Sequence, residues 1–264
     1  PETTIRSLAR EHQIDISRLR IVNALTSRDS AAIAIALVRS GDAEALMKGS
    51  LHTAELMSEV IAPVSGLHGK RTISHVFVLD VPAYPGPLLI TDAIINFAPN
   101  LQEKADIVQN AIDLAHAIGI PEPKVAILSA LERIDSNLPS TIDAAALCKM
   151  AERGQIKGGL LDGPLAFDNA VSLLAAKTMG IKSKVAGQAD ILVVPNMDSG
   201  NMMARQLEYL AGALTAGIVL GAQSPIILTS RNDSAETRIA SCVIASLVIQ
   251  HKRALASLSE NMKP

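Results

Sequence analysis

The sequence has no tryptophan, and aromatic residues make up only 2% of its 264 positions. Hydrophobic residues still form 48% of the chain, so alanine, isoleucine, leucine and valine must fill the core. A surplus of charge is also missing. The net charge of −2 gives no electrostatic basis for binding nucleic acid or an anionic membrane. The length suffices for one large α/β domain or two smaller ones.

Cysteine is scarce, and sequence motifs for metals and nucleotides are missing. The two cysteines, Cys148 and Cys242, lie in apolar helical patterns and are predicted to be reduced core residues of a cytoplasmic protein. The sequence has no CxxC, no HExxH and no close histidine pair, so we expect no metal site. No GxGxxG follows a predicted strand. In GLHGKRT (66–72) only two residues separate the glycines, and Arg71 replaces the Ser/Thr of a phosphate loop, so we reject it as a nucleoside triphosphate site.

Membrane-targeting signals are equally weak. No signal peptide is visible at the N-terminus, and the first residue is Pro1 rather than methionine, so an upstream segment is expected. The longest uncharged stretch covers residues 209–230. Its three glycines and the sequence QSP favour a buried helix, a turn and a buried strand over a membrane span.

Short apolar runs alternate with amphipathic helical patterns along the chain. The predicted strands are 18–24, 45–49, 74–81, 88–93, 124–130, 158–163, 190–195 and 225–230. The predicted helices are 27–41, 100–119, 140–154 and 166–180, each ending in glycine. Asn100 and Glu103 have the spacing of a capping box. This alternation predicts a mostly parallel sheet covered by helices.

One pair of strands breaks the alternation. Residues 76–93 place two strands around a Pro/Gly-rich turn at 82–87, which leaves no room for a crossover helix and predicts an antiparallel hairpin. The sheet should therefore be mixed. We expect a first subdomain formed by 1–66 plus 222–264, a second formed by 67–221, and an active cleft between them.

Polar residues follow the predicted strands, where ligands bind in open α/β sheets. They lie at 48–53, 91–92, 129, 162, 196–201 and 229–231. These side chains are mostly small and hydrogen-bonding. They suit a site that binds anions and transfers a group by positioning and electrostatics.

The segment TSRNDSAETR (229–238) is the strongest anion-site candidate. Arg231 offers a fork of donors suited to phosphate, Ser230 offers a hydroxyl, and a helix N-terminus should follow. Structural roles are also open. Asp233 and Glu236 have the spacing of a capping box, Ser230 could satisfy a nearby backbone group, and Arg231 could pair with either acid.

The other candidates also have structural alternatives. Lys48 could be a solvated lysine at a helix entry, and His52 a hydrogen-bonding residue of the first turn. Asp162 and Asp168 could serve as turn and cap acids. Capping alone would explain Asn201.

Several segments together resemble the phosphate acetyl/butyryl transferase family over nearly the whole chain. They are LMKGSLHTAELM (46–57), RTISHVFVLDVP (71–82), 87–120, PKVAILSALE (123–132), 150–172 and 185–236. SHVFVLDVP, ITDA, DGPLAFDNA and TSRNDSAE look more like the butyryl-type branch than the dedicated acetyl enzymes.

The resemblance implies reversible transfer of a short acyl group between CoA and inorganic phosphate, giving acyl phosphate. It also implies two α/β/α subdomains with a mostly parallel mixed sheet, similar to the isocitrate/isopropylmalate dehydrogenase-like fold. Family members usually form cytoplasmic homodimers without a metal or redox cofactor, and coenzyme A is a substrate.

In the family, the arginine matching Arg231 holds phosphate and the serine matching Ser230 lies near the CoA thiol. One departure concerns the acetyl-type aspartate proposed as the base, because Thr237 stands at that position and Glu236 precedes it. The candidate catalytic residues are Ser230, Arg231, Thr237 and Glu236. The candidate substrate-binding residues are Lys48, His52, Thr53, Ser74, Ser129, Asp162 and Asn201.

A second departure concerns length, since family members usually have further βα structure before the segment that matches PETTIRSLAREHQ. We therefore expect the transferase module of a larger protein, for instance one fused behind a hydratase domain. Two other functions remain open: a metal-dependent decarboxylating dehydrogenase of the same fold class, and a non-catalytic module that docks to a partner.

Overall fold

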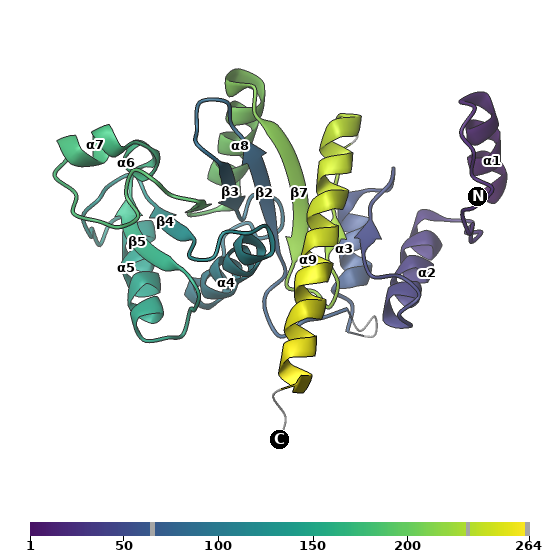
Figure 1. The fold of residues 1–264 in the computed structure, drawn as a ribbon, viewed down its shortest axis with the longest axis horizontal. Helices are drawn as coiled ribbons and strands as arrows, with labels where there is room; N and C mark the ends of the chain where they lie inside the picture. Colours follow the sequence, from purple (N-terminus) through teal and green to yellow (C-terminus); the bar gives the residue numbers. More distant parts are fainter. Residues whose placement is uncertain (64–66, 231–232, 262–264) are drawn as a thin grey trace.

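The computed structural model describes residues 1–63, 67–230 and 233–261 (Figure 1). Its helices are α1 (Glu2–Glu11), α2 (Ser27–Arg39), α3 (Thr53–Val60), α4 (Leu101–Ala117), α5 (Pro139–Glu152), α6 (Phe167–Val171), α7 (Leu173–Thr178), α8 (Met197–Ala211) and α9 (Ala235–Asn261). Its strands are β1 (Leu46–Met47), β2 (Ser74–Asp80), β3 (Pro87–Thr91), β4 (Lys124–Leu128), β5 (Leu160–Leu165), β6 (Ile191–Val193), β7 (Leu214–Leu220) and β8 (Ile226–Ile227).

The strands form one mixed sheet in the order β1-β8-β7-β2-β3-β6-β4-β5. The pairs β1–β8, β3–β6, β6–β4 and β4–β5 are parallel. Strand β2 pairs antiparallel with both β3 and β7, and β7 pairs antiparallel with β8. The β2–β3 hairpin confirms the predicted turn, and the helix-covered mixed sheet confirms the α/β class. The division into two subdomains stays a prediction.

Several sequence predictions need correction. The segment 18–24 is not a strand, and its residues are mostly exposed. The buried helix predicted within residues 209–230 is wrong. This stretch contains the end of α8 followed by strands β7 and β8, and β7 lies between β2 and β8 in the sheet. The helix predicted over 166–180 is divided into α6 and α7 at Ser172, whose backbone is extended. The capping box of Asn100 and Glu103 on α4 is confirmed.

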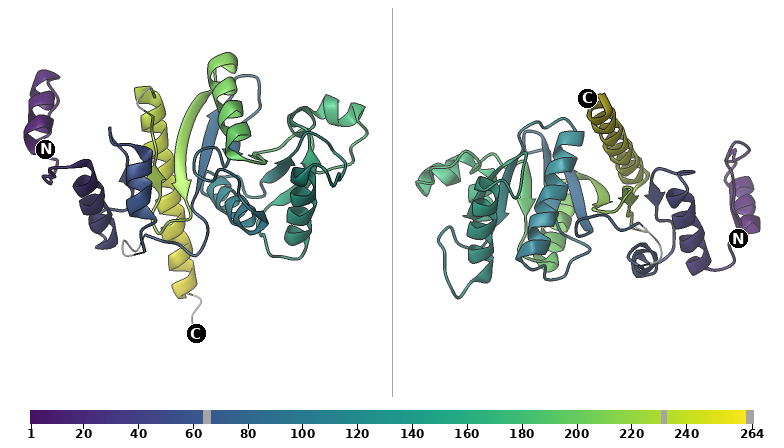
Figure 2. Two further views of the ribbon diagram at one scale, coloured as in Figure 1. Left: turned by 180° about the vertical axis from the view of Figure 1, so that it is seen from behind. Right: turned by 90° about the horizontal axis from the view of Figure 1, so that it is seen from below.

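Helices cover both faces of the sheet (Figure 2). On one face, buried residues of α4, α5 and α9 pack with Val76, Ile218 and other strand residues. On the other face, α6, α7 and α8 pack over the β2–β3–β6–β4 region, while α2 and α3 pack near β1 and β8. As predicted, alanine, isoleucine, leucine and valine supply most of this core.

Helix α9 is the longest helix described and is covered on only part of its surface. By length and composition, Ala235–Leu258 is the one described segment that could span a membrane, with a mean hydropathy of 1.2, and 17% of its window is buried. Cys242, on this helix, is exposed, so the prediction that it is a core residue is wrong. Cys148 on α5 is partly buried.

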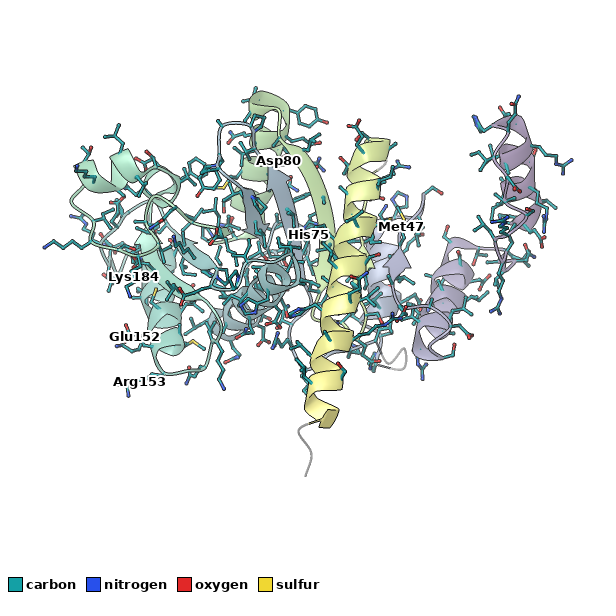
Figure 3. All side chains as sticks on the ribbon, in the orientation of Figure 1. Met47, His75, Asp80, Glu152, Arg153 and Lys184 are labelled. Carbon is teal, nitrogen blue, oxygen red and sulfur yellow. The ribbon has the colours of Figure 1, made fainter. Side chains whose placement is uncertain are left out.

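The centre of the sheet holds a buried histidine. His75 on β2 is fully buried (Figure 3), and within the described structure neither ring nitrogen is bonded. Its ring meets Phe77 edge-on, with centroids 4.5 Å apart. A Cβ on Gly217 would lie 2.9 Å from His75 Nε2, so a glycine in β7 makes room for the ring.

Burial, and secondarily the charge of Arg205, lowers the pKa of His75 from 6.5 to about 3. Between these values the unfolded chain binds a proton that the folded chain does not. The free energy of unfolding should therefore fall as the pH drops through this window, by on the order of 1 kcal/mol per pH unit from this group.

We expect His75→Leu to lose this part of the pH dependence. At about pH 7 the variant should be at least as stable as the original chain, because a desolvated polar group without a partner is removed. At about pH 5 the variant should be clearly more stable. Urea unfolding at both pH values measures this, with His12→Leu at an exposed position as the matched control. If the original chain and His75→Leu lost the same free energy of unfolding between pH 7 and pH 5, His75 would take up the proton in the folded state.

Candidate active site

A cavity of about 370 Å³ lies between α3 and α8 on one face of the sheet. We call it the α3–α8 cavity. It is lined by Lys48, Leu51, His52, Thr53, Phe77, Ile94, Arg205, Leu228, Thr229, Ser230 and Asp233. Four of the predicted site residues, Lys48, His52, Thr53 and Ser230, are thus brought together from segments far apart in the sequence. Both polar and apolar side chains line the cavity.

The parallel pairing of β1 and β8 brings Lys48 and Ser230 to the same place. Lys48 directly follows β1 and Thr229–Ser230 follow β8, so the two strand ends lie side by side. The Thr229 hydroxyl donates to the Lys48 carbonyl (3.4 Å). Lys48 is buried, and its ammonium donates to two nearby backbone carbonyls at 3.2 and 3.3 Å. Arg231 lies outside the described residues.

The N-terminus of α3 forms part of the cavity wall. His52 is the N-cap residue and Thr53 begins the helix. The Glu55 carboxylate accepts a hydrogen bond from the His52 backbone amide (3.1 Å). The first turn of a helix has N–H groups without intrahelical partners and carries a partial positive charge. This wall therefore favours an anion.

Arg205 is the main residue that the sequence reasoning missed. It projects from α8 with its guanidinium 5.8 Å from the centroid of the Phe77 ring, and it donates to Glu208 (2.6 Å). Asn201 precedes it by four residues, one turn earlier on the same helix face. This spacing of four residues from Asn201, a predicted site residue, is the sequence signal that could have identified Arg205.

A buried turn after β3 connects α8 to the cavity. Its Asp92 carboxylate accepts from the backbone amides of Ile94 (2.9 Å) and Ile95 (3.1 Å), while burial raises the pKa of this carboxyl. The Asn201 amide donates to the Ala93 carbonyl (3.2 Å). Asn201 therefore lies outside the cavity wall and ties α8 to the turn that places Ile94 there.

The turn before α9 differs from the capping pattern predicted for it. The Asp233 carboxylate accepts from the Ser230 backbone amide (2.6 Å). The Ser234 hydroxyl accepts from the Thr237 backbone amide (3.1 Å) and thereby caps the helix. The Asp233–Glu236 capping box is wrong, because Ser234 occupies the capping position. Glu236 is exposed on the first turn, and Thr237 is partly buried.

Three other predicted binding residues lie elsewhere in the fold. Ser74 is buried in β2 and accepts from the Asn110 side chain (2.9 Å). Ser129 shares a hydrogen bond with Ser140 (2.8 Å). Asp162 lies partly buried on β5 and accepts from the next backbone amide (2.8 Å). None of the three lines the α3–α8 cavity. Each instead makes a hydrogen bond within its own part of the fold.

The chemistry of the cavity is that of an anion site beside an apolar wall. Lys48 and Arg205 supply positive charge and Asp233 negative charge, with Glu208 bonded to Arg205. Across the part of the chain that the structure describes, no three His, Cys, Asp or Glu side chains cluster as a metal site would require. The apolar wall consists of Leu51, Phe77, Ile94 and Leu228.

Comparison with known proteins gives concordant matches. The family model described as "Phosphate acetyl/butaryl transferase" matches residues 2–246. A phosphate acetyltransferase of Rhizobium meliloti is 59% identical over 254 residues, which cover 96% of this chain and 80% of that protein. A phosphate butyryltransferase of Clostridium acetobutylicum is 43% identical over 248 residues, which cover 94% of this chain and 82% of that protein. The butyryl-type branch therefore stays a prediction, since the more similar of these two carries the acetyl name.

Solved structures agree with the fold. A branched-chain phosphotransacylase from Enterococcus faecalis V583 has a TM-score of 0.82 and 32% identity, covering 90% of this chain and 86% of that one. A 4-hydroxythreonine-4-phosphate dehydrogenase from Klebsiella pneumoniae has a TM-score of 0.53 at 15% identity, covering 84% and 70%, and shows a shared fold alone. The chain belongs to the phosphate acetyl/butyryl transferase family, and it is a phosphate acyltransferase by that membership.

Proposed function

We propose that the chain transfers a short acyl group, acetyl or butyryl, reversibly between CoA and inorganic phosphate. The observation that carries this proposal is the α3–α8 cavity, where Lys48, Arg205 and Ser230 converge beside an apolar wall. We further propose that the protein works as a cytoplasmic homodimer without a metal or redox cofactor, as the family resemblance implies.

The polar wall supports phosphate binding. Phosphate needs several donors and positive charge, which Lys48, Arg205 and the first turn of α3 offer together. Arg231, which directly follows Ser230, is proposed to add a second guanidinium on the basis of the family resemblance. The bond between Arg205 and Glu208 partly neutralises the Arg205 charge and must compete with the ligand.

The apolar wall supports binding of the acyl chain. Leu228 and Phe77 lie on the same face of the sheet, and Ile94 reaches the cavity from the turn after β3. A short acyl group packed here would have its carbonyl near the polar wall. One cavity would then hold the phosphate close to the thioester carbonyl. Holding two reactants in the right geometry is the main source of rate acceleration in such a transfer.

The proposed reaction needs no covalent enzyme intermediate. A phosphate oxygen attacks the thioester carbonyl, the carbon–sulfur bond breaks, and the CoA thiolate leaves and takes up a proton. Ser230 and the cationic groups stabilise the oxyanion that forms on the carbonyl. In the reverse direction the thiol must lose its proton. The positive environment of Lys48 and Arg205 favours the thiolate, so we propose activation by environment instead of by Glu236, which is exposed.

The first test is an assay for acyl-CoA turnover that depends on phosphate. We expect release of free thiol from acetyl-CoA or butyryl-CoA only when phosphate is added, with acyl phosphate as the second product and no requirement for magnesium. Reduction of a nicotinamide with a magnesium-dependent hydroxy acid substrate would instead indicate a dehydrogenase. Lack of turnover by the folded chain would favour a partner-docking module.

Arg205→Met should weaken the use of phosphate. The substitution keeps a long apolar stem over Phe77 and removes the charge, so kcat/KM for phosphate should fall roughly ten- to a hundredfold, about 1.5–3 kcal/mol. Glu236→Gln is the matched control and should stay near the original rate, because its side chain is exposed. An unchanged kcat/KM in Arg205→Met, or a large loss in folded Glu236→Gln, would contradict these assignments.

Ser230→Ala should lower kcat while leaving the fold intact, since the Ser230 side chain is only partly buried. Loss of one oxyanion donor typically costs about a hundredfold or more in rate. Steady-state kinetics and urea unfolding of the variant measure the two effects separately. Detection of an acyl group on Ser230 by mass spectrometry would overturn direct transfer.

A further inference from the structure

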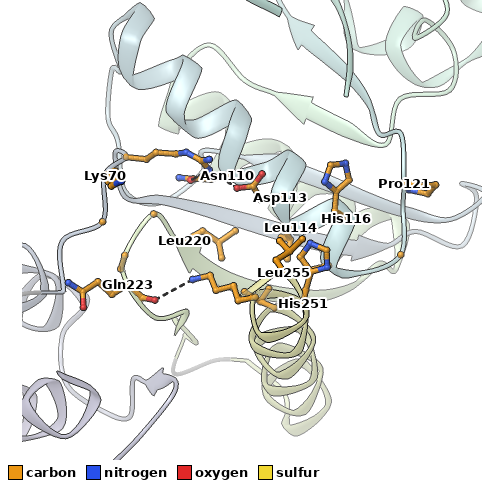
Figure 4. Close-up of a pocket in the computed structure, with 18 residues that line it drawn as sticks. Lys70, Asn110, Asp113, Leu114, His116, Pro121, Leu220, Gln223, His251 and Leu255 are labelled. Carbon is orange, nitrogen blue, oxygen red and sulfur yellow. Dashed lines mark hydrogen bonds and ion pairs between the residues drawn. The ribbon is translucent and has the colours of Figure 1, made fainter. Parts of the chain in front are cut away.

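A second and larger cavity lies on the opposite face of the sheet. It has a volume of about 860 Å³ and opens between the second halves of α4 and α9, next to residues 69–71 and 220–223 (Figure 4). We call it the α4–α9 pocket. It shares no lining residue with the α3–α8 cavity. Its volume lies within the range of small-molecule sites, about 300–1,000 Å³.

The floor of the α4–α9 pocket is apolar. Leu114 of α4, Leu220 at the end of β7 and Val248 of α9 are almost fully buried, and Leu255 extends this surface toward the rim. Such a floor accepts an apolar ring or a short chain by removing apolar surface from water.

The rim of the pocket carries an excess of positive charge. Lys70, Arg71 and Lys252 all line it, and Asp113 is the one carboxylate among the lining residues. That carboxylate is already bonded to Arg71 (2.5 Å). The partner of Lys252 is a neutral group, the Gln223 backbone carbonyl at 3.3 Å (Figure 4). A ligand that complements this rim carries negative charge.

The setting of Lys252 supports the same conclusion. Although its side chain is exposed at the rim, the surrounding protein desolvates the ammonium and thereby lowers its pKa, with Asp113 opposing this effect and Arg71 adding to it. An anion placed at Lys252 would offset that cost.

We propose that the α4–α9 pocket binds a small organic phosphate, with its apolar body on the Leu114–Leu220–Val248 floor and its phosphate at Lys252. This site is separate from the proposed acyl transfer and does not depend on it. A nucleoside monophosphate and an alkyl phosphate share the chemistry that the pocket recognises.

Helix α9 connects this pocket to the α3–α8 cavity. It begins at Ala235, two residues after Asp233 of the cavity, and continues without interruption to Val248, about 20 Å away. A ligand between α4 and α9 that moves the far half of the helix would also move its first turn, close to Asp233 of the α3–α8 cavity. Binding in the two cavities should therefore be coupled, and the coupling must be reciprocal.

Calorimetric titration of the chain with AMP and with hexyl phosphate tests the site. Adenosine and hexanol serve as phosphate-free controls and should bind at least about tenfold more weakly, since they lack the anion. Lys252→Met removes the charge, and Leu255→Glu places a carboxylate on the exposed edge of the floor without disturbing buried residues. Both variants should lose phosphate binding about tenfold or more. Lys177→Met at an exposed position of α7, and Arg205→Met in the other cavity, should bind as the original chain does.

Several results would overturn the proposal. These are no heat with either phosphate, equal binding of the phosphate-free controls, or unchanged binding in Lys252→Met and Leu255→Glu. A change of oligomeric state in these two variants without any phosphate binding would assign the surface to a second copy of the chain. The KM for phosphate, measured with and without AMP or hexyl phosphate, tests the coupling alone. An unchanged KM for phosphate would contradict the coupling through α9. It would leave the proposed site to be decided by the calorimetric titration.

Discussion

Antiparallel pairing of β2 with both of its neighbours is the constraint on which the rest of the fold depends. The parallel strands β1 and β8 run in one direction, and β3, β6, β4 and β5 run in the other. Strands β7 and β2 lie between these two groups and join them into one hydrogen-bonded sheet. The reversal also determines which loops meet, because the segment after β8 and the turn after β3 reach the same face.

The α3–α8 cavity is a consequence of this arrangement. The β1–β8 end supplies Lys48 and Ser230, and the other group of strands supplies Arg205 through α8 and Ile94 through the turn after β3. Each half thus contributes both polar and apolar side chains. The proposed acyl transfer needs a site that binds an anion and an apolar chain at once, and the cavity formed by both halves is our candidate for that site.

Strand β2 also explains the unusual position of His75. The His75 ring packs edge-on against Phe77, which the Arg205 guanidinium also approaches, and Gly217 in β7 leaves room for the His75 ring. Burial holds the His75 imidazole in its neutral form, so His75 brings no charge close to the α3–α8 cavity. The charges that face the cavity come from residues at its walls.

Local features of the fold could be predicted from the sequence alone. Helix α4 with its Asn100–Glu103 cap and the β2–β3 hairpin depend on residues close together in the chain, and short-range patterns specify them. Strand β7 was missed because residues 209–230 are uncharged and mostly apolar. A buried strand and a buried helix have the same composition there, and only pairing with β2 and β8 decides between them.

The sequence by itself determined the α/β class, the family and the polar segments at 48–53 and 229–231, because residue identity and order carry that information. The tertiary structure alone decided which of those polar residues share a cavity. It placed Lys48, His52, Thr53 and Ser230 together, added Arg205, and separated Ser74, Ser129 and Asp162 from them. Contacts between residues far apart in the chain depend on strand order and direction, which long-range pairing sets and no local pattern encodes.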